Sequence, residues 1–362
     1  MGKPDDAESG DPGAAGAADA AGAAGRSARS AVEVDAGGRL VRVSNPDKVF
    51  FSGLGATKLD LVRYYLEIAE PLMRTVQGRP ITMERYPDGA SGKSFYQKRV
   101  PTGPDWLVTT TVSTVNGTPS EALVLADIAH VVYAVNLGCL GFHPWPFHAD
   151  DPLHIDELRI DLDPSPGCTF DMVRETALAV RSLLSELDIT GYVKTTGSRG
   201  LHVYVRIREH LDSYAVRAAA VAFAREMERR HPDLCTAAWW KEERGARVFI
   251  DFNQNAPHKT VFGAWAARPR VGGQVSAPLS WDEVTTVEPD ALTIATVPNR
   301  VATLGDPWLT MNEKPQSIEP LLEWSARDLA NGLGDAPWPP VYPKMPGEPP
   351  RVAPSRAKKR PL

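Results

Sequence analysis

Apolar residues recur at helical spacing in three long segments of the chain and alternate with polar residues in several short ones. Residues 57–78 begin with Thr57, a residue suited to capping a helix N-terminus, and end at Gly78 before a proline. The apolar positions between these ends lie about one helical turn apart: Leu61, Tyr65, Ile68, Leu72 and Val76. This spacing predicts an amphipathic helix over residues 57–78.

The rest of the chain reads as strands and helices in mixed order. Strands are expected at 80–86, 94–100, 106–112, 158–163, 191–196, 201–207 and 247–252, and helices at 127–137, 170–187 and 213–230. Turn residues such as Asp88-Gly89 indicate short connections between neighbouring strands. The order predicts an α/β (α+β) fold with largely antiparallel central sheets flanked by helices.

Composition divides the chain into a folded region and two tails. Residues 1–30 are rich in Ala and Gly without periodicity, and residues 341–362 are rich in Pro and end in basic residues, so both are expected to be tails, the first disordered. One folded domain is expected at 31–340, with an N-terminal module at about 31–150 and a core at about 151–340 that carries the candidate chemistry described below. Three cysteines far apart indicate neither a disulfide framework nor a zinc site.

Charge and hydropathy restrict the possible partners. No apolar run approaches the roughly 20 residues of a membrane-spanning helix, so a cytoplasmic protein without a membrane partner is expected. The formal net charge of −5 argues against nonspecific coating of nucleic acid, although it permits a local basic site.

Two acids stand one residue apart at the end of an apolar strand, in "DELRIDLDPSPG". Side chains two apart on a strand share a face, so Asp161 and Asp163 converge. Asp251 ends another apolar strand and would join them if the strands are neighbours. Three carboxylates suit two hard divalent ions, Mn²⁺ or Mg²⁺, for phosphate chemistry. The alternative is that these acids only cap the next helix or solvate a turn.

The segment "TTGSRGLHVYV" places a glycine-containing turn between two predicted strands. Backbone amides of such a turn, with Ser198, Arg199 and His202, can surround phosphate oxygens. A plain hairpin is the alternative reading of the same residues.

Taken in order, "DLD", "GSRGLH" and "FIDFNQN" resemble the three catalytic motifs of the archaeo-eukaryotic primase superfamily. The greatest similarity is to the polymerase domain of bacterial ligase D, an enzyme of non-homologous end joining. It extends over "NPDKVFF", "TKLDLVRYY", "RPITMERYPDG", "SFYQK" and "GFHPW", from about Val43 to about Ala267 and on towards Pro340.

The resemblance implies template-directed nucleotidyl transfer from an NTP or dNTP, with Asp161, Asp163 and Asp251 as catalytic metal ligands. The residues it assigns to nucleotide binding are Thr196, Ser198, Arg199, Gly200, His202, Arg244, Gln254, Arg268 and His143. The family commonly has Lys where this chain has Arg199. Because a guanidinium is a planar fork and an ammonium a point charge, the two side chains would contact phosphate in different geometries.

The resemblance also implies contacts with DNA. Lys48 and Lys58 match two lysines that hold the 5′-phosphate of a gapped or broken duplex, and Lys58 opens a helix whose N-terminus favours anions. Phe95 and Tyr96 match an aromatic pair that stacks on template bases. Neighbours on a strand point to opposite sides, so one of the two is expected to face the core. A few placed contacts on an acidic protein predict strong salt sensitivity.

The expected activity is that of a DNA-dependent polymerase that fills short gaps or extends ends in bacterial DNA repair, with ribonucleotides preferred. No K-x-D-G ligase motif occurs in the sequence, so a separate ATP-dependent DNA ligase is expected as partner, near the nucleoid. Two alternatives remain open at this point: a primase that starts strands de novo, and a non-catalytic nucleic-acid-binding module.

Overall fold

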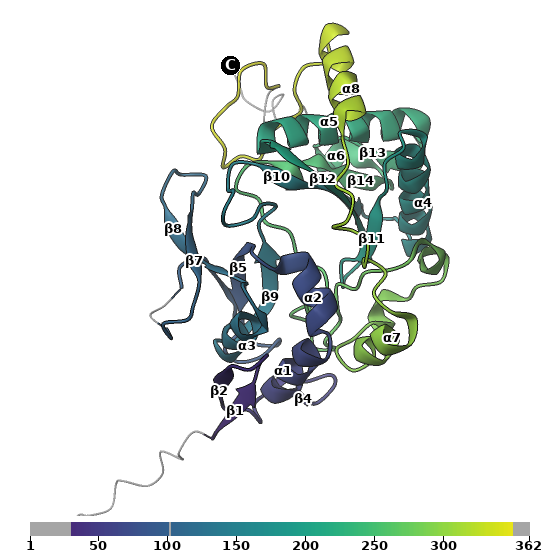
Figure 1. The fold of residues 1–362 in the computed structure, drawn as a ribbon. Helices are drawn as coiled ribbons and strands as arrows, with labels where there is room; N and C mark the ends of the chain where they lie inside the picture. Colours follow the sequence, from purple (N-terminus) through teal and green to yellow (C-terminus); the bar gives the residue numbers. More distant parts are fainter. Residues whose placement is uncertain (1–29, 101–102, 350–362) are drawn as a thin grey trace, which may run out of the picture.

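The computed structural model describes residues 30–100 and 103–349, and their strands form two five-stranded sheets and two small two-stranded ones (Figure 1). The elements up to residue 150 are β1 (Ala31–Asp35), β2 (Leu40–Ser44), β3 (Val49–Phe51), β4 (Ala56–Thr57), α1 (Lys58–Glu67), α2 (Ala69–Val76), β5 (Pro80–Arg85), β6 (Phe95–Gln97), β7 (Thr109–Val112), β8 (Ser120–Val124), α3 (Ile128–Asn136) and β9 (Cys139–Pro144).

The later elements are β10 (Ile155–Pro164), α4 (Phe170–Glu186), β11 (Tyr192–Thr195), β12 (Leu201–Leu211), α5 (Ser213–Arg230), β13 (Cys235–Thr236), α6 (Lys241–Arg244), β14 (Val248–Asp251), α7 (Val297–Leu304) and α8 (Glu319–Ala330). Three 3₁₀ helices lie between β14 and α7: η1 (Phe252–Asn255), η2 (Trp281–Thr285) and η3 (Pro289–Ala291). The predicted fold class of antiparallel sheets flanked by helices is confirmed.

The helix predicted for residues 57–78 is divided in two at Ile68. Thr57 caps α1 as expected: its Oγ1 accepts from the amide of Asp60 at 3.2 Å, and the Asp60 carboxylate accepts from the amide of Thr57 at 2.8 Å. At Ile68 the backbone leaves the helical region, with ψ near 24°, and α2 then begins. Both halves keep their apolar stripe buried, which is why the periodicity runs on through the break.

The second large sheet has the order β11-β12-β10-β14-β13, with only β13 and β14 parallel. Ile160 and Leu162 point into a core shared with Val173 of α4 and Val216 of α5, so the two helices cover one face of this sheet. Residues of β10 that alternate with these apolar ones, including Asp161 and Asp163, therefore point to the opposite face. The carboxyl end of β10 thus presents its acids on the face away from α4 and α5.

The chain after β14 returns to the N-terminal half. Residues from Val261 to Ala267 are buried in the same core as α1, where the Tyr64 hydroxyl donates to the carbonyl of Trp265 at 2.7 Å and Tyr65 accepts from the amide of Ala267 at 3.0 Å. This return connects the two large sheets through one continuous segment. Residues from the later half of the chain therefore pack in the core of the N-terminal half, across the boundary predicted near residue 150.

A buried ion-pair network also joins the two sheets. Asp156 of β10 accepts from Arg79, next to β5, and from Arg206 of β12, and all three side chains are nearly inaccessible to solvent. Glu157 lies beside both guanidinium groups and accepts from Arg159 at 2.8 Å. Burial opposes charge on Asp156, but the two arginines hold its pKa well below the ordinary value.

The predicted tails fall mostly on residues 1–29 and 350–362, which lie outside the described residues. Residues 341–349 are described, and within them Tyr342 is buried and its hydroxyl donates to the carbonyl of Pro257 at 2.5 Å. Among the described helices, none is both long and apolar enough to span a membrane. Cys139 and Cys235 are buried, Cys168 is partly exposed, and none of the three is in a disulfide.

Candidate active site

Three carboxylates meet on the face of the second sheet that points away from α4 and α5. Asp161 of β10 lies directly opposite Asp251 of β14 in the antiparallel register, and Asp163 follows two residues later on the same face. One oxygen from each of the three lies within 4.8 Å of the others. The expectation that Asp251 would join the pair is confirmed, because β10 and β14 are neighbours.

Asp161 is buried, Asp251 is partly buried and Asp163 is exposed, and the three carboxylates repel one another. Burial, with the neighbouring acids, raises the pKa of Asp251 to about 7, and burial raises the pKa of Asp161 to about 6. Oδ1 of Asp161 is buried, and no well-aligned hydrogen bond reaches it from the described residues, although the His202 ring is 3.2 Å away. An all-oxygen donor set with an unused buried acceptor fits a hard divalent cation such as Mg²⁺ or Mn²⁺, which would stabilise the charged form of all three acids.

Gln254 holds two of the acids in place. Its Nε2 donates to Oδ2 of Asp251 at 2.9 Å and to Oδ2 of Asp161 at 3.1 Å. The side chain was assigned to the nucleotide from the resemblance, and the structure places its amide on the triad. Any role towards the nucleotide remains a prediction.

His202 lies on β12 directly opposite Asp161, with Nε2 3.2 Å from Oδ1 of that residue. Burial and the charges of Lys194 and Arg268 hold the pKa of His202 well below its ordinary value. The ring is therefore neutral at pH 7, and its contact with Asp161 is not an ion pair.

The predicted glycine turn is built around Thr196. Its Oγ1 accepts from the amides of Ser198 at 3.1 Å and Gly200 at 3.2 Å, which fixes the turn from inside. A Cβ at Gly200 would lie 2.5 Å from the carbonyl of Leu162, and Gly197 has a φ of 68° with the Arg268 side chain close by. Both glycines are therefore required by the close packing of this turn against β10 and Arg268.

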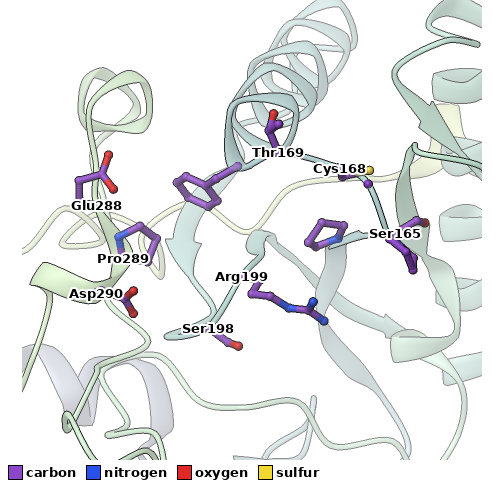
Figure 2. Close-up of a pocket in the computed structure, with 12 residues that line it drawn as sticks. Ser165, Cys168, Thr169, Ser198, Arg199, Glu288, Pro289 and Asp290 are labelled. Atoms are coloured by element: carbon purple, nitrogen blue, oxygen red, sulfur yellow. The ribbon is translucent and has the colours of Figure 1, made fainter. Parts of the chain in front are cut away.

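A cavity of about 310 Å³ opens between this turn and the loop that follows Asp163. Figure 2 shows Ser198 and Arg199 on one side of it, Cys168 and Thr169 at the start of α4 on another, and Glu288 and Asp290 opposite. Arg199 is exposed and close enough to Asp163 to oppose the rise in the pKa of that carboxyl. The guanidinium is thus exposed beside the acids, and its contact with a nucleotide remains a prediction.

Two further arginines lie near the triad, each on an aromatic ring. Arg268 stacks on Phe262 with 3.9 Å to the ring centroid and donates from Nε to the carbonyl of Thr196 at 2.7 Å. Arg244 stacks on Phe249 at 3.5 Å, and its charge is close to Asp163 and Asp251. These contacts fix the orientation of both cations, Arg268 at the turn and Arg244 near Asp163 and Asp251.

His143 of β9 is held at the edge of the site by three neighbours. Nε2 lies 3.2 Å from Oε2 of Glu84, and the ring packs edge-on against Tyr96 and Phe262 with centroid distances of 5.5 and 5.2 Å. Because Phe262 also carries Arg268, His143 belongs to the same group of side chains as the triphosphate candidates.

The two lysines assigned to the 5′-phosphate are joined through their backbones but differ in environment. The amide of Lys58 donates to the carbonyl of Lys48 at 2.8 Å. Lys48 is partly exposed and forms an ion pair with Asp88 at 2.7 Å. Lys58 is buried, and its Nζ donates to the carbonyls of Ser44 at 2.7 Å and Asn136 at 3.1 Å. Burial and the charge of Lys48 lower the pKa of Lys58 to about 8. Lys48 is therefore the more accessible of the two phosphate candidates.

The aromatic pair on β6 differs from the expectation for a strand with one buried face. Phe95 is 46% exposed and Tyr96 63% exposed, so the prediction that one of them faces the core is wrong. The strand lies at the edge of its sheet, where both rings stay open to solvent. Two exposed rings on an edge strand fit stacking on a nucleic acid base.

Sequence reasoning missed two buried charged residues of this site. Lys194 is fully buried on β11 opposite His202, and its Nζ donates to the carbonyl of Phe262 at 3.1 Å and to Ser276 Oγ at 2.5 Å. A lysine inside the apolar run "GYVKTT" was the available signal, and Glu84 inside "PITMERY" was a similar one.

The fold, with an acidic triad beside a glycine-containing turn, places the chain in the class of nucleotidyltransferases of the archaeo-eukaryotic primase type. Residues 57–308 match the model of the family described as LigD, primase-polymerase domain. The chain belongs to this family, which confirms the resemblance stated above.

Individual relatives agree with this assignment. The chain is 33% identical over 269 residues to the multifunctional non-homologous end joining protein LigD of Mycolicibacterium smegmatis, a match that covers 74% of this chain and 35% of that protein. It is 31% identical over 278 residues to the bifunctional LigD of Bacillus subtilis, covering 76% of this chain and 44% of that one. The chain thus spans less than half the length of these relatives.

A solved structure shows the same fold. The polymerase domain from Mycobacterium tuberculosis ligase D in complex with DNA superposes with a TM-score of 0.70 at 27% identity, covering 76% of this chain and 99% of that one. The similarity therefore includes nearly the whole of that polymerase domain.

Proposed function

We propose that this protein is a template-directed polymerase that fills short gaps or extends ends in duplex DNA during repair, with ribonucleotides preferred. The observation that carries the proposal is the meeting of Asp161, Asp163 and Asp251 within 4.8 Å, next to the turn at Thr196. The membership of the LigD primase-polymerase family supports the same reaction.

Divalent ions held by the three acids would supply Lewis-acid activation of a primer 3′-hydroxyl and charge neutralisation on a triphosphate. The residues of the chain act around this chemistry. Gln254 fixes the orientation of two carboxylates, and the neutral ring of His202 beside Asp161 adds no positive charge that would compete with a cation. Both effects preorganise the ligand set before substrate binds.

The basic side chains are arranged for the triphosphate. The Arg199 guanidinium and the stacked guanidinium of Arg268 together present donors and positive charge beside the acids. We assign to them the stabilisation of charge on the leaving pyrophosphate. Arg244, held on Phe249, contributes from the β14 side.

DNA binding is assigned to two separate places. Lys48, with the neighbouring helix N-terminus at α1, would receive the 5′-phosphate on the far side of a gap, and a hollow lined by Asn45, Asp47 and Lys48 lies there. Phe95 and Tyr96 would stack on the template. The M. tuberculosis polymerase domain, which has this fold, was solved in complex with DNA, and this supports DNA as the partner.

The test is extension of a primer across a short, 5′-phosphorylated gap with Mn²⁺ or Mg²⁺, using ribo- and deoxyribonucleotides. Asp161→Ala should reduce incorporation at least about 100-fold, because a ligand position is lost. Asp233→Ala, which removes an exposed acid after α5, serves as the matched control. Extension by Asp161→Ala at the rate of the control would refute the metal assignment, and synthesis on a template without a primer would identify a primase instead.

A further inference from the structure

Glu84 lies beside Tyr96, which we assign to the template, and His143, which we assign to the nucleotide. It lies on β5 and is only 8% exposed, an unusual position for a carboxylate. Its Oε2 lies 3.2 Å from Nε2 of His143, and its Oε1 accepts from the hydroxyl of Tyr86 at 2.9 Å. Each carboxylate oxygen therefore has its own partner.

The strands on either side of β5 are shaped around this carboxylate. On β6, Tyr96 is the residue directly opposite Glu84, so the two side chains share a face. On β9 the residue opposite is Gly141, where a Cβ would lie 2.6 Å from Oε2 of Glu84. The missing side chain at position 141 makes the room that Glu84 occupies.

Charge links the same carboxylate to the triphosphate candidates. Burial alone would raise the pKa of Glu84, but hydrogen bonds from His143 and Tyr86 and the charge of Arg268 lower it, so the group is ionised at pH 7. Burial lowers the pKa of Arg268, and the charges of Glu84 and Asp161 oppose this, so both carboxylates are close enough to act on its guanidinium. Glu84 is thus a fixed negative charge near the cation that the proposed function assigns to the triphosphate.

We propose that Glu84 is a positioning residue that orients His143 and Tyr96 together, and that it couples the binding of the template strand to the binding of the incoming nucleotide. Tyr96 packs edge-on against His143, so a base stacked on Tyr96 restricts a ring that also contacts Glu84 and Phe262. Ordering by either ligand lowers the cost of ordering for the other, which is positive coupling. The inference rests on the proposed function, because it takes Tyr96 as a template contact and His143 as a nucleotide contact.

The coupling is measured by titrating the protein with a fluorescent ATP analogue in Mn²⁺, with and without a gapped duplex whose primer ends in a dideoxynucleotide. The ratio of the two affinities is the coupling factor. Glu84→Gln keeps the shape of the side chain but has only one oxygen for two donors. We expect it to reduce the coupling factor by about 10-fold, the effect of losing one charge-assisted hydrogen bond.

Two further variants separate positioning from a general loss of structure. Glu121→Gln on β8 of the same sheet removes the charge of an exposed glutamate that accepts from Thr109 at 3.3 Å, and it should leave the coupling factor unchanged. His143→Ala should reduce coupling as Glu84→Gln does, and combining the two should add nothing, because both act through one contact.

An unchanged coupling factor in Glu84→Gln would overturn the proposal, and so would additive losses in the double variant. Equal losses in Glu84→Gln and Glu121→Gln would also overturn it, since they would indicate a nonspecific effect on the sheet. The assay measures binding and remains decisive if the wild-type protein incorporates no nucleotide, a result that would refute the polymerase proposal alone.

Discussion

Asp251→Asn is expected to make the metal-free protein more stable while removing a metal ligand. In the folded protein this carboxyl is partly buried opposite Asp161, and burial with the neighbouring acids raises its pKa from 3.8 to about 7. The folded state therefore holds a proton that the unfolded chain releases between these pH values. Stability falls as the pH rises through this window, and the full cost is present above pH 7. An asparagine carries no such cost.

The size of the effect follows from the shift and from the hydrogen bonds of Asp251. A rise of about 3 pH units at about 1.4 kcal/mol each amounts to roughly 4 kcal/mol above pH 7. Asn253 donates to Oδ1 at 3.0 Å, a bond that asparagine can keep, whereas the Gln254 bond at 2.9 Å loses its acceptor if the new amide nitrogen faces it. That loss costs about 1 kcal/mol. A net gain of about 3 kcal/mol is expected at pH 8.

Thermal unfolding of both proteins in a chelator at pH 5 and pH 8 measures this gain. The variant should unfold at a higher temperature than the wild type at pH 8, and the difference should shrink at pH 5. Adding Mn²⁺ should then raise the unfolding temperature of the wild type more than that of the variant, because ligand binding stabilises the folded state. A variant no more stable than the wild type at pH 8, or a difference independent of pH, would refute the electrostatic reasoning.

Two further predictions concern regions outside the triad. Asp156→Asn should lower the free energy of unfolding by about 3 kcal/mol in urea titrations, because it leaves the buried guanidinium groups of Arg79 and Arg206 undercompensated, and a change under about 1 kcal/mol would contradict this. Lys48→Ala should weaken binding to gapped DNA and reduce the slope of log K against log salt by about 1, but only when the downstream 5′-phosphate is present. Equal weakening without that phosphate would remove Lys48 from this role.

The sequence predicts most of the secondary structure because the apolar periodicity of each element is set by the core it faces. Ile160 and Leu162 are buried under α4 and α5, and the acids that alternate with them are consequently placed on the other face. The triad could be predicted for the same reason, once β10 and β14 proved to be neighbours. The turn at Gly197 and Gly200 could also be predicted, because glycines between two apolar strands indicate a tight turn.

Features that depend on tertiary packing could not be predicted in this way. The ammonium group of Lys58 is buried against the carbonyls of Ser44 and Asn136. Both residues are distant from Lys58 in the sequence, so its local sequence gives no sign of this burial. The exposure of both Phe95 and Tyr96 depends on the position of β6 at a sheet edge. The role inferred for Glu84 likewise depends on tertiary structure, because β5 brings it between Tyr96 of β6 and Gly141 of β9.

The register between β10 and β14 makes correct folding and a complete set of ligands a single event. Pairing that slipped by one residue would turn Asp251 towards α4 and α5 and bring Ile250 to the opposite face. Such a molecule would bury a carboxylate in hydrocarbon and would be eliminated by its own instability. Populations of this protein should therefore contain few stably folded but inactive molecules, so activity per folded molecule should vary little between preparations that differ in yield.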